Sequence, residues 1–378
     1  MSRMHGSRRT ASEEAAYVKD LRHTGETALG CREALCVHYG VCGGTQAANQ
    51  FNCFACEGPA CATCDLTCPY AKAFTERMLD VGGLDCNALP KDLRQPPITL
   101  PEYVPVVLHA SSRTGLLQTS FAALPLYRLF RMAGGEYRSI AADAKELRQR
   151  FLLSPATKII LRGVDQDKYL ETYWKHRRKD RAAEQLARLG IFAIIAPNFS
   201  HFLDAPRTHS LYNRKRQLIC LAELANAGLT VIPHLNAAHP GDWQFWLDWL
   251  RANPQIAVVA IEFQTGRRTP TRGRAAIEQI RRIRDQLGRQ LQLILVGGSR
   301  FAAAAAPWFR NLSVMDVRPF WNAMHRRLFE PRRGKWLLSP TMPWAMLDDQ
   351  LDRNIRTYRF WIERRIQNAR FVAGNRVA

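Results

Sequence analysis

The stretch AVVAIEFQ, from Ala257 to Gln264, contains the pattern from which the fold of this chain can be inferred. It is a short aliphatic run that follows Asn253 and Pro254 and ends on a carboxylate, Glu262. An amphipathic stretch, Arg274–Leu287, comes next. A short apolar run bounded by turn residues and followed by a helical pattern is typical of a buried strand in a parallel sheet.

The same alternation of strand and helix recurs on both sides of this stretch. The candidate strands are Val104–His109, Tyr137–Ala141, Thr157–Arg162, Ile191–Ala196, Thr230–Pro233, Ala257–Glu262, Leu291–Val296 and Ser313–Val317. Amphipathic stretches separate most of them, among them Tyr169–Leu189, Leu211–Ala227 and Trp243–Ala252. Eight such repeats predict an α/β protein with a (β/α)8 TIM-like barrel. A doubly wound sheet, which needs only five or six repeats, is the alternative.

The barrel is expected to occupy residues 101–326 of the 378-residue chain. A Pro-rich boundary, Leu89–Pro101, separates it from a cysteine-rich metal-binding region, residues 1–100, and a basic helical segment, residues 327–378, follows it. Neither an apolar segment long enough to cross a membrane nor the apolar core of a secretory signal is apparent, so we expect a cytoplasmic protein with no membrane partner.

Eight cysteines lie close together in the N-terminal region: Cys31, Cys36, Cys42, Cys53, Cys56, Cys61, Cys64 and Cys68. Disulfides are rare in a reducing compartment, so the cluster predicts a metal site. Two C-x2-C pairs can fill a tetrahedral zinc site. The end of the cluster, with Pro69 after Cys68, resembles a bacterial ferredoxin run, so an iron–sulfur cluster is the other interpretation. The metal is expected to be structural, with redox or radical chemistry as the alternative.

The formal net charge of +21 is unevenly distributed. Residues 1–100 hold 10 Lys and Arg against 11 Asp and Glu, so residues 101–378 hold 44 against 22. So basic a region favours a polyanionic partner, and we expect a nucleic acid, with DNA favoured over RNA. The alternative is a solvated basic surface with no such partner.

Catalytic residues of barrels lie at the carboxyl ends of the strands. Three residues there are candidates for acid–base or charge-stabilising roles: Glu262, Asp316 and His109. Five polar residues are candidates for reading the edges of a base, because they offer donors and acceptors: Asn198, Ser200, His234, Asn236 and Gln264. Each also has a structural alternative, such as a buried ion pair, a helix cap or a core histidine.

A third group of strand-end residues is suited to binding phosphate. It consists of Arg162, Gly298, Ser299, Arg300 and Arg318. Arginine matches phosphate oxygens with paired donors, and the stretch VGGSR, Val296 to Arg300, predicts a glycine turn leading into a helix. Asp165, close behind Arg162, also follows a candidate strand.

Three segments together resemble an uncharacterised domain family found in phages and mobile elements. They are IFAIIAPNFSHFLDAP from Ile191, LYNRKRQ from Leu211 and AGLTVIP from Ala227. The family's strand ends in G-P-D-F-S, where this chain has Ala196 for Gly and Asn198 for Asp. The resemblance implies a phage-related role, such as phage defence, but no specific activity. More distantly, a basic barrel with a cysteine-bound metal is similar in architecture to tRNA-guanine transglycosylases.

From these features we expect an enzyme that acts on a base within a nucleic acid. The expected reaction is cleavage of the N-glycosidic bond by a glycosylase or a base transglycosylase, with a carboxylate stabilising oxocarbenium character. Two alternatives stay open: a metal-stabilised nucleic-acid-binding protein without catalysis, and an iron–sulfur redox or radical enzyme.

Overall fold

A computed structural model describes residues 64–68, 71–86, 93, 96–202, 205–238, 240–339 and 346–375. The chain divides into two compact units. The first contains residues up to Cys86, together with Ser200–Lys215 and Ala237–Phe245. The second contains the remaining residues, so the helices α7 (Arg207–Asn226) and α8 (Pro240–Ala252) contribute residues to both units.

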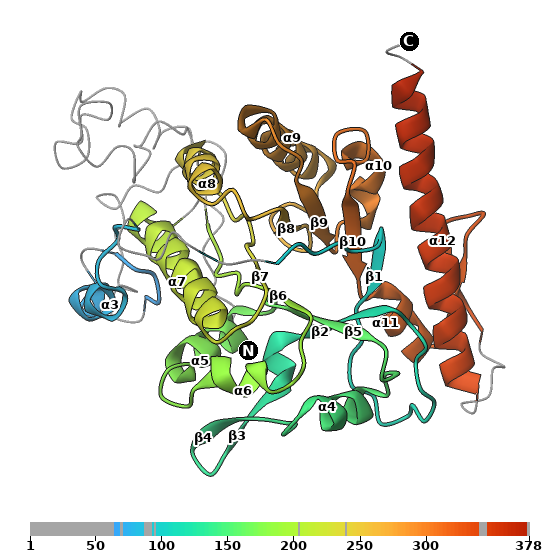
Figure 1. The fold of residues 1–378 in the computed structure, drawn as a ribbon, viewed down its shortest axis with the longest axis horizontal. Helices are drawn as coiled ribbons and strands as arrows, with labels where there is room; N and C mark the ends of the chain where they lie inside the picture. The colour runs from blue at the N-terminus through green and yellow to red at the C-terminus, as the bar shows by residue number, and fades with distance from the viewer. Residues whose placement is uncertain are drawn as a thin grey trace. The chain divides into compact units, whose positions relative to one another are not determined.

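The second unit contains two four-stranded parallel sheets (Figure 1). One sheet has the order β1-β10-β9-β8, formed by Tyr103–Pro105, Leu312–Asp316, Gln292–Val296 and Val258–Glu262. The other has the order β2-β5-β6-β7, formed by Phe121–Pro125, Lys158–Arg162, Ala193–Ile195 and Val231–Ile232. The prediction of an α/β fold with parallel strands is therefore confirmed.

Isolated parallel bridges link the two sheets at both of their edges. Val106, just after β1, bridges to Ala123 of β2, and the Val107 amide donates to the Ala123 carbonyl over 2.9 Å. His234, just after β7, bridges to Ala260 of β8, and the Leu235 amide donates to the Ala260 carbonyl over 2.7 Å. Each link is a single bridge rather than a continuous ladder.

The predicted second strand, Tyr137–Ala141, does not join either parallel sheet. Its first part belongs to β4 (Glu136–Ser139), which pairs antiparallel with β3 (Phe130–Ala133) in a separate hairpin. Gly134 and Gly135 form the two-residue turn, with φ of 59° and 79°. Glycine adopts these angles at little cost, which suits such a hairpin turn. The strand that pairs with β5 in the parallel sheet, where Tyr137–Ala141 was predicted, is instead β2, Phe121–Pro125.

Helices and short turns connect the parallel strands of the second unit. Besides α7 and α8, they are the 3-10 turn η5 (Leu126–Leu129), α4 (Ala144–Phe151), α5 (Asp167–His176), α6 (Ala182–Ala187), α9 (Pro270–Leu287), η6 (Ser299–Phe301), α10 (Ala302–Ala305) and α11 (Arg318–Met324). The expected helices after the third to sixth predicted strands are thus present.

The C-terminal segment is a hairpin followed by one long helix. Strands β11 (Arg327–Glu330) and β12 (Lys335–Leu338) precede α12 (Leu347–Gly374), which contacts α10, α11 and β1 (Figure 1). The rings of Phe329, Trp336 and Trp361 pack around Tyr358 of α12, with centroids 4.9 to 5.6 Å from its ring. Trp336 and Trp361 therefore hold the helix to the hairpin.

A single apolar cluster fills the space between the parallel strands. It includes residues from every one of them: Val104, Ala123, Ile160, Ala193, Ile195, Ile232, Val258, Ala260, Ile294, Val296 and Met315. Within a strand, members are two positions apart, as alternation along a strand requires. Cys220 of α7 is also fully buried, as predicted, and burial raises the pKa of its thiol to about 12.

The described part of the first unit joins α3 (Phe74–Val81) and the segment before it to the start of α7. The Thr67 amide donates to Nδ1 of His209 over 3.1 Å, and the Thr208 hydroxyl donates to the Thr67 carbonyl over 2.6 Å. These bonds tie the segment that carries Cys64 and Cys68 to α7.

Among the described residues of this unit is a buried carboxylate, Asp242. It pairs with Arg207 at 2.6 Å and Arg214 at 3.1 Å. Burial would raise the pKa of Asp242, but the charges of Arg207, His201 and Arg214 and the hydrogen bond from Arg207 together outweigh that effect and hold the pKa well below its ordinary range. Asp242, Arg207 and Arg214 thus form a buried ionic cluster among the described residues of the first unit.

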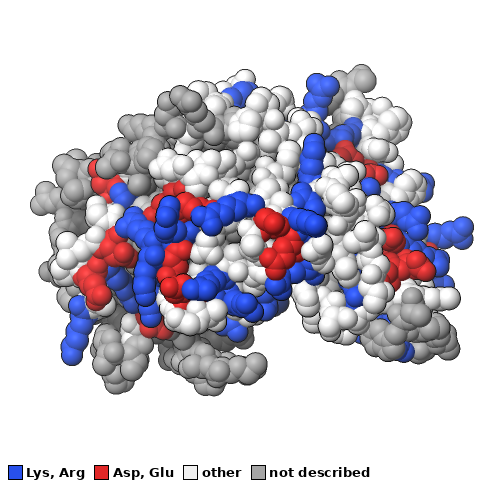
Figure 2. All heavy atoms as spheres, turned by 60° about the horizontal axis from the view of Figure 1, so that its bottom comes forward, with Lys and Arg blue, Asp and Glu red and all other residues white. Residues whose placement is uncertain are grey.

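The surface charge is mixed on the face drawn in Figure 2. Lys and Arg there are interspersed with Asp and Glu instead of forming one uninterrupted positive field. Many exposed arginines of the described residues also pair within their own helices, for example Arg150 with Glu146. Among the described helices, none combines the length and apolar character needed to span a membrane.

Candidate functional site

The residue that marks a site at the carboxyl ends of the parallel strands is Arg162. It is the last residue of β5 and is only 9% exposed. Its Nη1 donates to Oε1 of Gln264 over a long 3.4 Å, and its Nε has no hydrogen-bond partner among the described residues. Burial lowers the pKa of this guanidinium, and the nearby charge of Asp165 opposes the shift.

Arg162 differs from the other buried arginines of the described chain. Each of the others has a carboxylate within ion-pair distance: Arg113 has Asp348, Arg177 has Glu223, Arg214 has Asp242 and Arg216 has Glu171. No described carboxylate lies that close to Arg162. A buried charge without a partner costs several kcal/mol, so this position is suited to an anion that the protein itself does not supply.

Glu262, at the end of β8, is bonded within its own loop. Oε2 accepts from the amides of Gln264 and Thr265 over 2.7 and 3.2 Å, and Oε1 accepts from the Thr265 hydroxyl over 2.8 Å. Arg267 lies 4.0 Å from Oε1. The carboxylate therefore shapes the loop that brings Gln264 to Arg162.

Asp316, at the end of β10, is held by two other elements. Oδ1 accepts from the Arg318 amide over 3.0 Å, and Oδ2 accepts from Arg318 Nε over 2.8 Å and from the Tyr358 hydroxyl over 3.0 Å. Arg318 also donates to the Tyr358 oxygen. Arg318 is thus the ion-pair partner of Asp316, and the carboxylate is fixed by the start of α11 and the middle of α12.

Two further polar groups belong to this end of the strands. The Oδ1 of Asn198, 8% exposed just after β6, has no hydrogen-bond partner among the described residues. Asp165, three residues after Arg162, is half-buried, and among the described residues its carboxylate accepts one hydrogen bond, at Oδ1 from the Gln166 amide over 2.9 Å. Asp165 therefore has a carboxylate oxygen available, unlike Glu262 and Asp316.

The sequence indicated Asp165 by its place after a strand, but the carboxylates predicted to be catalytic were Glu262 and Asp316. Nothing in the sequence pointed to Tyr358, which reaches Asp316 from a helix 42 residues away. Arg267, whose Nη2 lies 3.4 Å from Oδ1 of Asn236, was visible only as half of an Arg pair.

The remaining predicted strand-end residues have identifiable structural contacts. Asn236 donates to the Phe199 carbonyl over 2.7 Å, and the backbone carbonyl of Asn236 accepts from Trp246 over 2.8 Å. His234 is fully buried beside Ala260. His109 is exposed, with its ring edge toward Phe151. Ser200 belongs to the first unit, where its carbonyl accepts from Asn213.

The glycine turn after β9 has a packing explanation. A Cβ at Gly298 would lie 2.6 Å from the Phe263 ring, and Gly297 has a φ of 68°. Ser299 is buried in a 3-10 turn that leads into α10, which has only four residues. Arg300 donates to the Arg268 carbonyl over 3.1 Å. This short helix offers little dipole for an anion.

The predicted metal site falls almost wholly outside the described residues. Of its eight cysteines, only Cys64 and Cys68 are described, and both are half-buried free thiols. Cys31, Cys36, Cys42, Cys53, Cys56 and Cys61 lie outside the described residues. Within the part that is described, no group of three or more His, Cys, Asp or Glu residues is placed to bind a metal.

Comparison with known proteins adds no family to these observations. No family model matches the chain, and no curated protein matches it. The residues around Arg162 are therefore the basis on which a function can be inferred.

Proposed function

We propose that the two parallel sheets form the wall of one (β/α)8 barrel. Three observations support this: the bridges from β1 to β2 and from β7 to β8, the strand order within each sheet, and the apolar cluster to which all the parallel strands contribute. In such a barrel the carboxyl ends of the strands surround one mouth, where the chemistry takes place. Arg162, Asp165, Asn198, Glu262 and Asp316 all follow or end strands at that mouth.

At this mouth we propose an enzyme that acts on a nucleotide unit of a nucleic acid and cleaves its N-glycosidic bond. The observation that carries the proposal is Arg162, a buried guanidinium with no described carboxylate within ion-pair distance. Phosphate oxygens match the donors of arginine, and a bound phosphate would compensate its charge.

The other residues take roles that follow from their contacts. Asp165 has an available oxygen near the guanidinium and is the group for stabilising oxocarbenium character or activating water. The Asn198 Oδ1 can accept from a base amino group. Glu262 and Asp316 act as positioning residues for Gln264 and Arg318.

The test is to incubate the protein with DNA and RNA carrying normal and modified bases, and to measure free base and abasic sites by mass spectrometry. Asp165→Asn should lower base release at least about 100-fold, in the range of a lost general acid or base. Arg162→Met should abolish it, whereas Arg188→Met, at an exposed arginine, should retain it. Equal release by wild type and Asp165→Asn would contradict the assigned role.

A binding protein without catalysis is the second candidate. It is favoured by the engagement of Glu262 and Asp316, whose oxygens all accept hydrogen bonds from the protein. Salt-dependent binding of nucleic acid without base release from any substrate would select it.

The cysteine-bound metal, iron–sulfur or zinc, remains a separate proposal. Elemental analysis and the absorption spectrum of the purified protein test it, since an iron–sulfur cluster absorbs visible light and zinc does not. Replacing Cys53 and Cys56 by serine should lower the metal content of the protein.

A further inference from the structure

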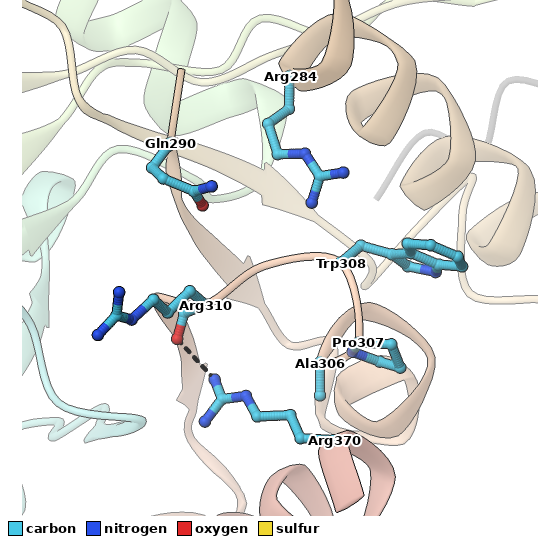
Figure 3. Close-up of a pocket in the computed structure, with 7 residues that line it drawn as sticks. All are labelled: Arg284, Gln290, Ala306, Pro307, Trp308, Arg310 and Arg370. Carbon is cyan, nitrogen blue, oxygen red and sulfur yellow. Dashed lines mark hydrogen bonds between the residues drawn. The ribbon is translucent and has the colours of Figure 1, made fainter. Parts of the chain in front are cut away.

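A second basic site lies at the opposite ends of two strands. It is a hollow of about 370 Å³ lined by Arg284, Gln290, Ala306, Pro307, Trp308, Arg310 and Arg370 (Figure 3). Gln290 precedes β9 and Arg310 precedes β10, so the hollow lies at the amino ends of these strands, away from Arg162. The volume is within the range of small-molecule sites.

Three arginines surround the hollow, and their charges are unequally compensated. Arg370 is fixed by Glu102 at 2.5 Å and by the Arg310 carbonyl at 2.8 Å, the contact drawn in Figure 3. The Arg284 Nε donates to Asp285 over 2.9 Å. The exposed Arg310 guanidinium makes no hydrogen bond or ion pair with the described residues. The hollow therefore has one uncompensated positive charge beside two arginines that have further donors.

An aromatic side chain and an amide complete the lining. Trp308 is 45% exposed, so its ring is accessible to a ligand. Arg281 lies over the ring, 5.0 Å from its centroid. The exposed Gln290 offers both a donor and an acceptor. Arginine for phosphate, a ring for stacking and an amide for a base edge are the three groups that recognise a nucleotide.

We propose that this hollow binds a nucleotide, with its phosphate on Arg310 and Arg284 and its base stacked on Trp308. The nucleotide is either free or a unit of a single strand. The site is independent of the strand-end function proposed above, because it uses other residues at the other ends of the strands.

The experiment measures binding of AMP, inorganic phosphate and a short oligothymidylate by calorimetry, in an Arg162→Met background that removes the strand-end anion site. Arg310→Ala should weaken AMP binding about tenfold. Trp308→Ala should weaken AMP and oligonucleotide binding about tenfold while leaving phosphate binding unchanged. Both positions are exposed, so these variants should fold. Arg274→Ala, which removes an exposed arginine from the same helix as Arg284, is the matched control.

Either ligand source supports the site: AMP binding comparable to that of the oligonucleotide indicates a free nucleotide, and binding of the oligonucleotide alone indicates a strand. The proposal is overturned if neither binds, or if Arg310→Ala and Trp308→Ala lose no more affinity than Arg274→Ala. It is also overturned if phosphate binds as tightly as AMP and Trp308→Ala changes neither.

Discussion

Arg162 carries a buried charge with no described carboxylate within ion-pair distance, and this has a measurable cost. In the absence of an anion, Arg162→Met should raise the free energy of unfolding by about 1–3 kcal/mol, because an apolar side chain of similar length removes an unpaired buried charge. Arg177→Met is the contrast, because it removes the hydrogen bonds that Arg177 donates to Glu223 and to the Trp174 carbonyl, while Glu223 keeps Arg178. It should lower the free energy of unfolding by about 1.5–3 kcal/mol.

Chemical denaturation in phosphate-free buffer measures both values. If Arg162→Met destabilises as much as Arg177→Met does, Arg162 has a structural role that the described contacts do not explain.

Asp242 determines how the first unit responds to acid. The pKa of its carboxyl is depressed in the folded state, so its contribution to stability is present above the ordinary carboxyl pKa of about 4 and is lost as the pH falls through the folded value. Asp242→Asn should cost about 3–5 kcal/mol at pH 7, because Arg207 and Arg214 lose their shared partner.

Denaturation curves at pH 7 and pH 3 test this prediction. The difference in stability between wild type and Asp242→Asn should shrink at the lower pH. An unchanged difference would mean that the pKa of Asp242 is the same in the folded and the unfolded protein. Asp248→Asn, at an exposed ion pair, is the control and should change stability by less than about 1 kcal/mol.

Among the elements, α12 links the end of the chain to the strand-end site through Tyr358. Tyr358→Phe removes the hydrogen bond that the Tyr358 hydroxyl donates to Oδ2 of Asp316 and should lower the free energy of unfolding by about 1.5–3 kcal/mol. If the barrel mouth is catalytic, base release should fall with it, because Asp316 then holds Arg318 less firmly. Tyr169→Phe, whose ring lies 4.9 Å from Arg128, serves as the control. Equal effects of the two substitutions would show that the Tyr358 hydroxyl positions nothing.

The elements also show what the sequence could and could not predict. Seven parallel strands follow from their aliphatic and β-branched runs, of which Val258–Glu262 is typical. Strand β2, FAALP, was missed because alanine and proline are poor strand formers and its pairing partners lie elsewhere in the chain. The pair Gly134–Gly135, with alternating residues on both sides, indicates a hairpin. The prediction that Tyr137 belongs to a parallel strand left this hairpin signal out of account.

Part of the candidate site could also be predicted from the sequence. Arg162, Glu262 and Asp316 follow from their places at strand ends, since parallel strands bring those ends together. Their contacts were not predictable, because the partner of Asp316 comes from α12 and the missing partner of Arg162 is visible only in three dimensions.

At the scale of the whole second unit, the proposed barrel would close through the two bridged seams. The amides of Val107 and Leu235 donate across them, and Ala260 donates to the Pro233 carbonyl over 2.9 Å. If the wall is continuous, hydrogen exchange at these amides should be as slow as at Leu293 in the middle of its sheet. Exchange faster by about 100-fold or more at both seams would mean that the two sheets open independently.

The pairing of β1 with β10 has a consequence for synthesis on the ribosome. Tyr103 has no strand neighbour on that side until Val314 has emerged, and the ion pair of Glu102 with Arg370 joins residues 268 positions apart. Contacts this distant in sequence slow folding, so the first strand of the nascent chain must wait with an open edge while the rest is translated. Tyr358 of α12, which fixes Asp316, follows it by 42 residues, so the strand-end site is assembled only after α12 has left the ribosome.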